Sequence, residues 1–316
     1  MKILLTGYTG LLGRHVAKYL KTEGYWVRVL LHAKTVTRRE ITREVDEYLF
    51  GAMDDEKVIR QALEGIDCVI HCGWKFNPNG VLHPTINEKA IELLFNESEN
   101  AHIKRFAYIS SIAVYGMQGR AEKIIETNQL AQGEELIFTY PKEKILIENM
   151  LATKFSNQMF IGIFRPGPIF DDRKSPIKKI VPFIGKKLGI GFGNGKNVMP
   201  LIHADDVANA IFLWIRDNKS SNIFNITPDR DITYKEWFKN WGKVHNLNIK
   251  PVFIRGFILI ILASFATLVK RILGKKGKVD VSYVIAAATR NLSYSNNKAK
   301  LTLGWEPVIT QKYSDN

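Results

Sequence analysis

A tyrosine and a lysine four residues apart could carry acid–base chemistry in this chain. Tyr140 and Lys144 stand in the segment Tyr-Pro-Lys-Glu-Lys, and at this spacing they would share one face of a helix. Pro141 suits the first turn of such a helix, because its missing N–H would have no intrahelical partner there. A phenol with a pKa of about 10 is a poor base near neutrality, but a neighbouring ammonium favours the phenolate. The pair predicts a proton-transferring tyrosine; two surface residues on an ordinary helix are the alternative.

Hydroxyl groups follow a predicted strand upstream of this pair. The strand is expected over residues 103–110, and Ser110 and Ser111 stand at its end. Open α/β sheets bind ligands at the carboxyl ends of their strands, so Ser111 could hydrogen-bond a substrate oxygen beside Tyr140. A serine that only caps a turn is the alternative.

Three glycines at a spacing of three follow the first predicted strand. Gly7, Gly10 and Gly13 come directly after the apolar run Ile3–Leu5, in the segment Thr-Gly-Tyr-Thr-Gly-Leu-Leu-Gly. The first would allow a tight turn, the second would let backbone approach a pyrophosphate, and the third would let a helix pack against the sheet. The N-terminus of that helix would offer N–H groups to the phosphates. The pattern predicts a dinucleotide-binding turn, with a turn that binds no ligand as the alternative.

Size and composition are typical of a folded protein from a reducing compartment. The chain has 316 residues, 46% of them hydrophobic and 24% charged, enough for one large or two interlocked domains. A strand is predicted directly after Met1, so we expect no secretory signal peptide and a cytoplasmic location. Cys68 and Cys72 are too far apart along a strand for an easy disulfide, and we expect no metal site there.

The formal net charge of +14 is compatible with several anionic partners. Nucleic acid is not expected, because the positive residues are scattered and form no zinc-finger, helix-turn-helix or RNP-like pattern. Phosphorylated cofactors, anionic substrates and anionic membrane surfaces all remain compatible with the charge.

Short apolar strands alternate with helical segments through the first half of the chain. This alternation predicts an α/β fold, a doubly wound parallel sheet of the Rossmann type with helices on both faces. Strands are predicted at residues 2–6, 26–31, 47–51, 67–71, 103–110 and 159–164. Helices are predicted at residues 11–23, 54–64, 84–100 and 140–155. In the last helix one face carries Ile147, Met150, Leu151 and Phe155.

The regular alternation weakens after Phe164, where prolines become frequent. A helix over 204–216 and a strand near 223–226 could return to the sheet. We therefore expect a dinucleotide-binding domain over residues 1–165, with 200–227 returning to it. A smaller, mostly helical substrate-binding lobe would comprise residues 166–199 and 228–316.

Together these motifs resemble the extended short-chain dehydrogenase/reductase family, also called the NAD-dependent epimerase/dehydratase family. The resemblance runs nearly end to end, and it is far more specific for fold and cofactor class than for substrate. It rests on Thr6–Gly13, Val69–Gly73, Ser110–Gly116, Tyr140–Lys144, Phe164–Phe170, Pro200–Ala208 and Leu303–Pro307.

The resemblance implies a Ser-Tyr-Lys site for NAD(P)-dependent chemistry. Tyr140 would be the general acid/base, Lys144 would bind the nicotinamide ribose and tune the tyrosine, and Ser111 would polarise the reacting oxygen. Besides Tyr140 and Lys144, cofactor contacts are expected at Gly7, Thr9, Gly10, Leu11, Leu12, Gly13, His32, Lys34, Ala52, Met53, His71, Cys72, Gly73, Asn87, Ser110, Pro166 and Ile169.

Two expectations in this set carry an alternative. Asn87 could equally be a surface residue of a helix. His203 is expected to hold a strand-to-helix junction together with Asp205 and Asp206, with one of the aspartates as a helix cap, instead of acting as a base.

Residues after the second and third predicted strands bear on the choice of cofactor. Sites that prefer NAD place an acid at the end of strand two, but here His32 and Lys34 follow the strand, with Arg38 and Arg39 beyond. Positive charge suits a 2′-phosphate and favours NADP(H) over NAD(H), unless these are solvated loop residues. Ala52 stands where many relatives carry an aspartate that contacts the adenine, so that contact would be missing.

The family has branches with different substrates. One branch, which includes 3β-hydroxysteroid dehydrogenases and dihydroflavonol-reductase-like enzymes, acts on hydroxyl and keto groups of apolar molecules, and Arg165–Pro168 is similar to it. We therefore predict an oxidoreductase that transfers hydride to or from a secondary alcohol or ketone of a sterol- or lipid-like molecule. Lysines at 178, 179, 186 and 187 could instead bind a sugar diphosphate. A nucleotide-sugar epimerase or dehydratase is thus one alternative, and a non-catalytic NADP(H)-sensing protein is another.

Residues 256–269 are apolar on every side of a helix. At 1.5 Å per residue they would span about 21 Å, short of the roughly 30 Å core of a bilayer. One interpretation is a helix buried in the smaller lobe or covering an apolar substrate pocket. The other is a peripheral contact with the inner face of a membrane, because Arg255 precedes the segment and basic residues follow it. The family resemblance also implies a homodimer.

Overall fold

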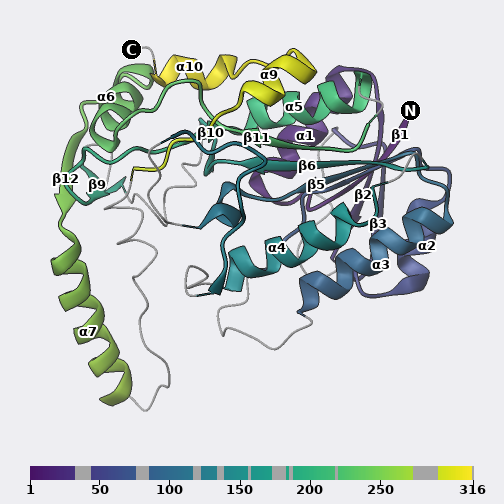
Figure 1. Ribbon diagram of the computed structural model, residues 1–316, viewed down its shortest axis with the longest axis horizontal. Helices are drawn as coiled ribbons and strands as arrows, with labels where there is room; N and C mark the ends of the chain where they lie inside the picture. Colours follow the sequence, from purple (N-terminus) through teal and green to yellow (C-terminus); the bar gives the residue numbers. More distant parts are fainter. Residues whose placement is uncertain are drawn as a thin grey trace.

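Seven parallel strands form the central sheet, in the order β11-β6-β5-β4-β1-β2-β3 (Figure 1). The computed structural model describes residues 1–32, 44–75, 85–116, 122–133, 139–155, 158–172, 183–184, 188–217, 220–272 and 291–314. The strands of the sheet are β1 (Lys2–Thr6), β2 (Trp26–Leu31), β3 (Glu47–Phe50), β4 (Cys68–His71), β5 (Arg105–Ile109), β6 (Phe160–Pro166) and β11 (Asn222–Ile226). The expected doubly wound sheet is therefore present, and the strand near residue 223 does return to its edge beside β6.

Helices cover both faces of this sheet. One face carries α1 (Leu11–Thr22), α5 (Ala204–Asp217), α9 (Asn297–Leu303) and α10 (Val308–Ser314). The other face carries α2 (Glu56–Leu63), α3 (Ile86–Asn100) and α4 (Thr139–Ala152). Alternate residues of β1 supply both cores: Ile3 and Leu5 pack with α1 and α5, while Leu4 packs with the opposite layer. A strand buried on both faces reads as a continuous apolar run, which explains its clear signal in the sequence.

The second half of the chain builds a smaller lobe at one end of the sheet. Its elements are β7 (Ile169–Phe170), β8 (Phe183–Ile184), β9 (Leu188–Phe192), β10 (Ile202–His203), α6 (Tyr234–Val244), β12 (Lys250–Ile254) and α7 (Gly256–Ile272). Strands β12, β9 and β8 form a small sheet, and an aromatic core around Trp237, Phe238 and Trp241 holds α6 against the lobe. The lobe thus contains strands as well as helices.

The helix predicted over residues 140–155 ends earlier than expected. Its last residue is Ala152, so Phe155 lies outside the helix and is exposed, while Ile147 and Leu151 are buried as predicted. Tight turns end the helix: the Lys154 amide donates to the Leu151 carbonyl at 3.0 Å, and the Thr153 hydroxyl donates to the Met150 carbonyl at 2.7 Å. Hydroxyl side chains compete with helical hydrogen bonds in this way.

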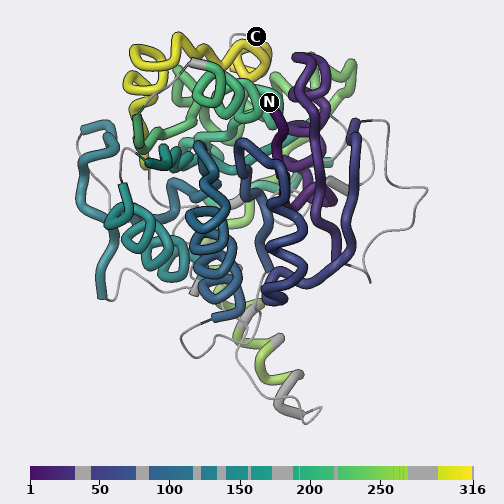
Figure 2. The backbone as a smooth tube through the Cα atoms, turned by 90° about the vertical axis from the view of Figure 1, so that its right-hand side faces the viewer, coloured from purple at the N-terminus to yellow at the C-terminus, as the bar shows by residue number. Residues whose placement is uncertain are grey.

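The structure excludes one interpretation of residues 256–269, a helix buried in the smaller lobe. Helix α7 is not buried in the lobe, because its large apolar side chains are exposed, Phe265 to 65% and Ile261 to 61%. Figure 2 shows the helix projecting from the body of the protein. Within the described ranges, no helix combines the length and the hydropathy that crossing a bilayer requires.

Candidate active site

The glycine turn meets the loop after β4 at the carboxyl edge of the sheet. Strands β2 and β4 flank β1 on opposite sides, so the chain order reverses here, which is where doubly wound sheets bind ligands. Gly7 has φ +77°, and a Cβ on it would lie 2.4 Å from the Gly73 nitrogen. His71 is fixed beside this turn because its Nδ1 lies 2.8 Å from the Thr6 hydroxyl. Only glycine fits at position 7, as the turn motif predicts.

The N-terminus of α1 is shaped to receive an anion. A Cβ on Gly13 would lie 2.2 Å from the Gly7 carbonyl oxygen, so the helix packs directly against the turn. A Cβ on Gly10 would meet only that oxygen within 4 Å, which leaves space above the turn. No side chain among the described residues caps this helix, and its first turn holds no acid. The free N–H groups and the glycine turn therefore fit the pyrophosphate of a dinucleotide.

The other residues expected in this turn divide between surface and core. Thr9 is exposed and Leu11 half-buried, whereas the Leu12 side chain packs in the core. Leu12 could therefore contact a phosphate only through its backbone N–H.

Tyr140 and Lys144 lie near the carboxyl end of β5, and their four-residue spacing brings them together on one face of α4, as predicted. Both stand in the first turns of α4, and the Lys144 ammonium lies 5.8 Å from the centre of the Tyr140 ring. The ammonium donates a 2.6 Å hydrogen bond to the carbonyl of Ile109, the last residue of β5. Ser111 follows two residues later, and its hydroxyl oxygen accepts a 3.2 Å hydrogen bond from the Ala113 amide.

Trp74 completes this cluster, although no motif in the sequence pointed to it. It follows Gly73 in the loop after β4, and its ring centre lies 3.8 Å from the Lys144 ammonium. Its ring also meets the Tyr140 ring edge to face at 5.2 Å. An indole over an ammonium is a favourable cation–π contact. The loop after β4 and helix α4 are thus joined at the two residues expected to move a proton.

Burial changes the acid–base character of Lys144. Removal from water lowers its pKa to about 7, while Glu148, Cys72 and Glu143 act in the opposite direction. Its charge in turn helps burial to lower the pKa of His71 to about 3. His71 is therefore neutral at physiological pH, and so low a pKa makes it a weak proton acceptor and a poor general base.

This burial predicts a pH-dependent stability for the ligand-free protein. Between about pH 7 and the unfolded pKa of about 10.4, the unfolded chain binds a proton at Lys144 that the folded chain has lost. The folded state should therefore gain up to about 1.4 kcal/mol per pH unit in this window relative to Lys144→Met. Urea unfolding of both proteins at several pH values measures the difference. If the free energies of unfolding of the two proteins change with pH in the same way, Lys144 keeps an ordinary pKa.

Asn87 is half-buried at the junction of α3, α4 and the loop after β4. Its side chain accepts from the Lys75 amide at 3.0 Å, donates to the Lys75 carbonyl at 2.9 Å and donates to Glu143 at 3.1 Å. The amide group thus ties α3 to the Trp74–Lys75 segment and to α4. Its position supports the loop that holds Trp74, and the cofactor contact expected of it stays a prediction. Glu143, which the sequence did not single out, is buried in this junction.

The remaining expected cofactor contacts lie around the same edge of the sheet. Ala52 and Met53 follow β3 and are half-buried, and His32 is exposed after β2. Ser110 and Pro166 are buried at the ends of β5 and β6, and Ile169 begins β7. The loop with Lys34, Arg38 and Arg39 lies outside the described residues, as do Lys178, Lys179, Lys186 and Lys187.

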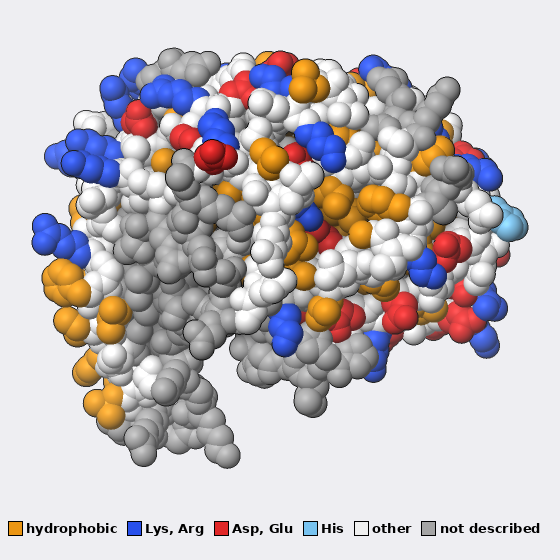
Figure 3. All heavy atoms as spheres, viewed as in Figure 1, with side chains coloured by type: hydrophobic (Ala, Val, Ile, Leu, Met, Phe, Trp, Pro, Cys, Tyr) orange, Lys and Arg blue, Asp and Glu red, His pale blue; other side chains and the backbone are white. Residues whose placement is uncertain are grey.

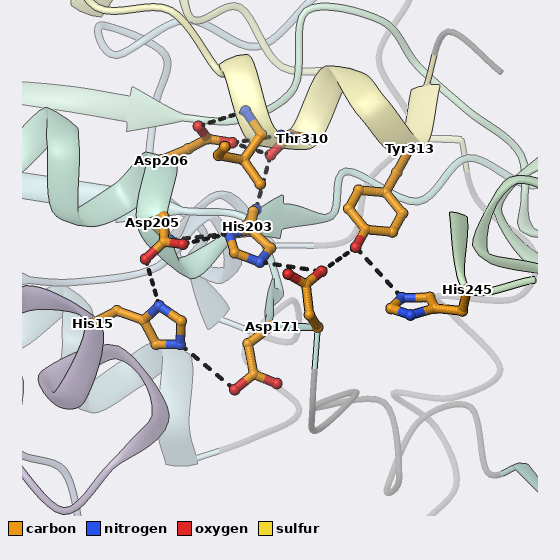
Figure 4. A network of polar contacts seen from close by, with 10 residues as sticks. His15, Asp171, His203, Asp205, Asp206, His245, Thr310 and Tyr313 are labelled. Atoms are coloured by element: carbon orange, nitrogen blue, oxygen red, sulfur yellow. Dashed lines mark hydrogen bonds and ion pairs between the residues drawn. The ribbon is translucent and has the colours of Figure 1, made fainter. Parts of the chain in front are cut away.

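A histidine–aspartate network links α1 to α5 and to the lobe (Figure 4). His15 on α1 lies 2.6 Å from Asp205 and 3.5 Å from Asp171, which hold its pKa above the usual value even though burial opposes its charge. His203 accepts from the Asp205 amide at 3.2 Å at the start of α5, and Asp206 accepts from the Thr310 amide at 2.7 Å at the start of α10. These residues hold the junction as expected, but the helix that Asp206 caps is α10. Among the described residues no cluster could hold a metal ion.

A buried ion pair fixes β6 against α4. Arg165 donates three hydrogen bonds to Glu148, the shortest at 2.5 Å, and both side chains are almost fully buried. Its guanidinium also donates to the Tyr115 hydroxyl at 2.6 Å, which donates to Asn225 at 2.7 Å. The network joins α4, which carries Tyr140, to the segment that follows Ser111.

Comparison with known proteins agrees with this geometry. A sequence model of the NAD dependent epimerase/dehydratase family matches residues 3–227, more than half of the chain. The decarboxylating sterol-4-alpha-carboxylate 3-dehydrogenase of Dictyostelium discoideum is 25% identical over 322 residues, covering 97% of this chain and 96% of that protein. The UDP-glucose 4-epimerase of Lactobacillus helveticus is also 25% identical, over 339 residues that cover 97% and 92%.

Among solved structures, the UDP-glucose 4-epimerase of Thermotoga maritima with UDP-glucose has the same fold. Its TM-score is 0.71 at 20% identity, and the match covers 99% of this chain and 96% of that one. The chain belongs to the NAD-dependent epimerase/dehydratase family and is an NAD(P)-dependent enzyme of the extended short-chain dehydrogenase/reductase type.

Proposed function

We propose that this enzyme transfers hydride between NADP(H) and a secondary alcohol or ketone of an apolar, sterol- or lipid-like molecule. The observation that carries the proposal is the meeting of Tyr140, Lys144 and Trp74 at the end of β5, next to Ser111. A protein that only senses NADP(H) has no need of this arrangement.

The residues would divide the chemistry between them. A bound nicotinamide supplies or accepts the hydride. Tyr140 gives a proton to the carbonyl oxygen, or takes one from the hydroxyl, on the same substrate carbon. Protonated Lys144 favours the phenolate form of Tyr140, and because burial brings the Lys144 pKa to about 7, this support is present near and below neutral pH. The Ser111 oxygen already accepts from the Ala113 amide, so its own hydrogen is directed to a further acceptor such as the substrate oxygen.

The cofactor would lie across the edge where β1 and β4 end. Gly7, Gly10, Gly13 and the first N–H groups of α1 would hold its pyrophosphate. The loop His71–Gly73 would contact it from the side of β4. NADP(H) is favoured over NAD(H) because His32 and the basic residues after it offer no acid to a 2′-hydroxyl.

The same proposal includes the domain boundaries of the chain, its oligomeric state and its location in the cell. Residues 1–165 and 200–227 would bind the cofactor, while 166–199 and 228–316 would form the substrate lobe. The enzyme would work as a cytoplasmic homodimer that touches a membrane through α7. An apolar substrate concentrates in such a membrane.

A nucleotide-sugar epimerase or dehydratase is the second candidate, because a UDP-glucose 4-epimerase has the same percentage identity to this chain as the sterol dehydrogenase. Calorimetry with UDP-sugars and nicotinamide absorbance assays with sterols and aliphatic ketones separate the two. We expect oxidation of NADPH with an apolar ketone and a lower rate with NADH. Binding of a UDP-sugar, without turnover of any sterol or ketone, would overturn the proposal.

A further inference from the structure

Helix α7 exposes apolar side chains over more than half of its circumference. The exposed apolar residues on it are Phe257, Ile258, Ile260, Ile261, Leu262, Phe265, Leu268 and Val269. At 100° per residue they cover an arc of about 200°. A helix that packs on one protein surface needs a stripe of only about 100°. An apolar surface this wide is better suited to an apolar medium that surrounds the helix than to contact with one face of a protein.

The helix leaves the body of the protein instead of folding back on it. Figures 1 and 2 show it projecting from β12, beyond the small sheet of the lobe. Among the described elements none packs along its length. Seventeen residues give a length of about 25 Å, too short to cross a bilayer core of roughly 30 Å but long enough to enter one.

Basic side chains are exposed on the elements that precede this helix in the chain. Lys235, Lys239 and Lys243 form one exposed row on α6, Lys250 begins β12, and Arg255 directly precedes α7. We call these five residues the basic collar. Figure 3 shows blue side chains at the end of the molecule from which the orange side chains of α7 project. The collar and the apolar helix therefore lie at the same end of the molecule.

The lysine row of α6 lines a hollow in the surface. The hollow has a volume of about 660 Å³, and besides the three lysines it is lined by Asn246, Asn248 and the apolar residues Phe238 and Ile249. Residues 235–255 contain five Lys and Arg but a single acid, Glu236. That carboxylate is already paired with Arg230 at 3.0 Å and with the Thr233 amide at 2.8 Å. Glu236 also interacts with Lys239, so the segment carries one carboxylate against five cationic side chains and has an excess of positive charge.

We propose that α7 and the basic collar together form a docking surface for an anionic lipid bilayer. Helix α7 inserts into the apolar part of one leaflet without crossing the membrane, and the lysine-lined hollow binds anionic lipid headgroups. Insertion of apolar side chains and attraction of lysines to anionic lipids are additive sources of membrane affinity. This inference gives the lipid class and the binding residues for the membrane contact in the proposed function, on which it rests.

Vesicle co-sedimentation of the full-length protein, without cofactor or substrate, tests this surface. We expect binding to vesicles of phosphatidylcholine with phosphatidylserine, weak binding to phosphatidylcholine alone, and a loss of binding as salt is raised. Each lysine near an anionic surface strengthens binding about fivefold, so Lys235→Gln, Lys239→Gln and Lys243→Gln together should weaken it about 100-fold. The same change at three exposed lysines on the opposite side, Lys57, Lys89 and Lys104, is the matched control and should leave binding unchanged.

A second pair of variants tests the apolar helix. Ile261→Glu with Phe265→Glu should abolish vesicle binding, whereas Leu301→Glu, at an 87% exposed position on α9, should not. Equal binding to neutral and anionic vesicles would overturn the role of the collar. Failure to bind any vesicle, with a dimer that the α7 variant converts to a monomer in sedimentation velocity, would show that α7 contacts a second copy instead.

The two proposals can fail separately. Tyr140→Phe should bind vesicles like the unmodified protein, because Tyr140 belongs to α4, which is separate from α6 and α7 (Figure 1). If vesicle binding follows the expected pattern but no apolar ketone is turned over, the substrate assignment fails and the docking surface stands. If turnover is found but vesicle binding is not, the docking surface fails and the oxidoreductase stands.

Discussion

Replacing Tyr140 with phenylalanine should lower kcat by about 10²–10⁴-fold, the usual contribution of a positioned acid or base. The change removes the hydroxyl that would exchange a proton with the substrate but keeps the ring that packs against Trp74. The cofactor contacts of the glycine turn remain, so the Kd for NADPH should not change. Steady-state kinetics and fluorescence titration with NADPH measure the two quantities.

The matched control for this variant is Tyr25→Phe. Tyr25 precedes β2 at the amino end of the strands, and its ring packs against Phe212 on α5. This variant should keep the full rate. A Tyr140→Phe enzyme that also keeps its rate would contradict the role proposed for Tyr140, whatever the substrate is.

Replacing Glu148 with leucine should have the largest effect on stability. Arg165 would then be left in the core without its carboxylate, and removal of one member of a buried ion pair typically costs about 3–5 kcal/mol. The hydrogen bond from Arg165 to Tyr115 should reduce this loss of stability. Urea unfolding followed by circular dichroism measures the change in the free energy of unfolding.

Two further variants identify the cause of that loss. Adding Arg165→Met to Glu148→Leu should restore much of the stability, because an apolar pair leaves no charge unpaired. Lys154→Met removes an exposed ion pair with Glu99 and should leave the midpoint of urea unfolding nearly unchanged. If Glu148→Leu also leaves the midpoint of urea unfolding unchanged, the Arg165–Glu148 ion pair is not the structural link between α4 and β6 that its geometry indicates.

Much of the fold could be predicted because its signals are local. The apolar run before Gly7, the glycine spacing and the alternation of strands and helices are all read over short windows, and the first four strands were placed within a residue of their observed bounds. Tyr140 and Lys144 were found because a helix brings residues at this spacing to one face. The predicted end of α4 lies three residues too late. The spacing of apolar residues does not reveal that the Thr153 hydroxyl competes for a helical hydrogen bond.

What the sequence did not reveal depends on contacts between distant segments. Trp74 lies on Lys144 only because β4 and β5 are neighbours in the sheet, and no spacing rule connects residues 74 and 144. Asn87 was ambiguous for the same reason, since its partners are on a loop and on α4. For α7, a helix that is apolar on all sides gives the same pattern whether it is buried or projects, so only the structure could decide.

Trp305 and α10 complete the core that β1 and α1 form. Trp305 is buried in the core that β1 and α1 share, and the carboxylate of Asp206 is satisfied by amides of α10. These partners lie about 100 residues beyond Asp206, so the packing around α1 and α5 is complete only when distant segments of the chain have met. A deletion that removes Trp305 and α10 would therefore open part of this core and leave the buried Asp206 carboxylate without its amide partners.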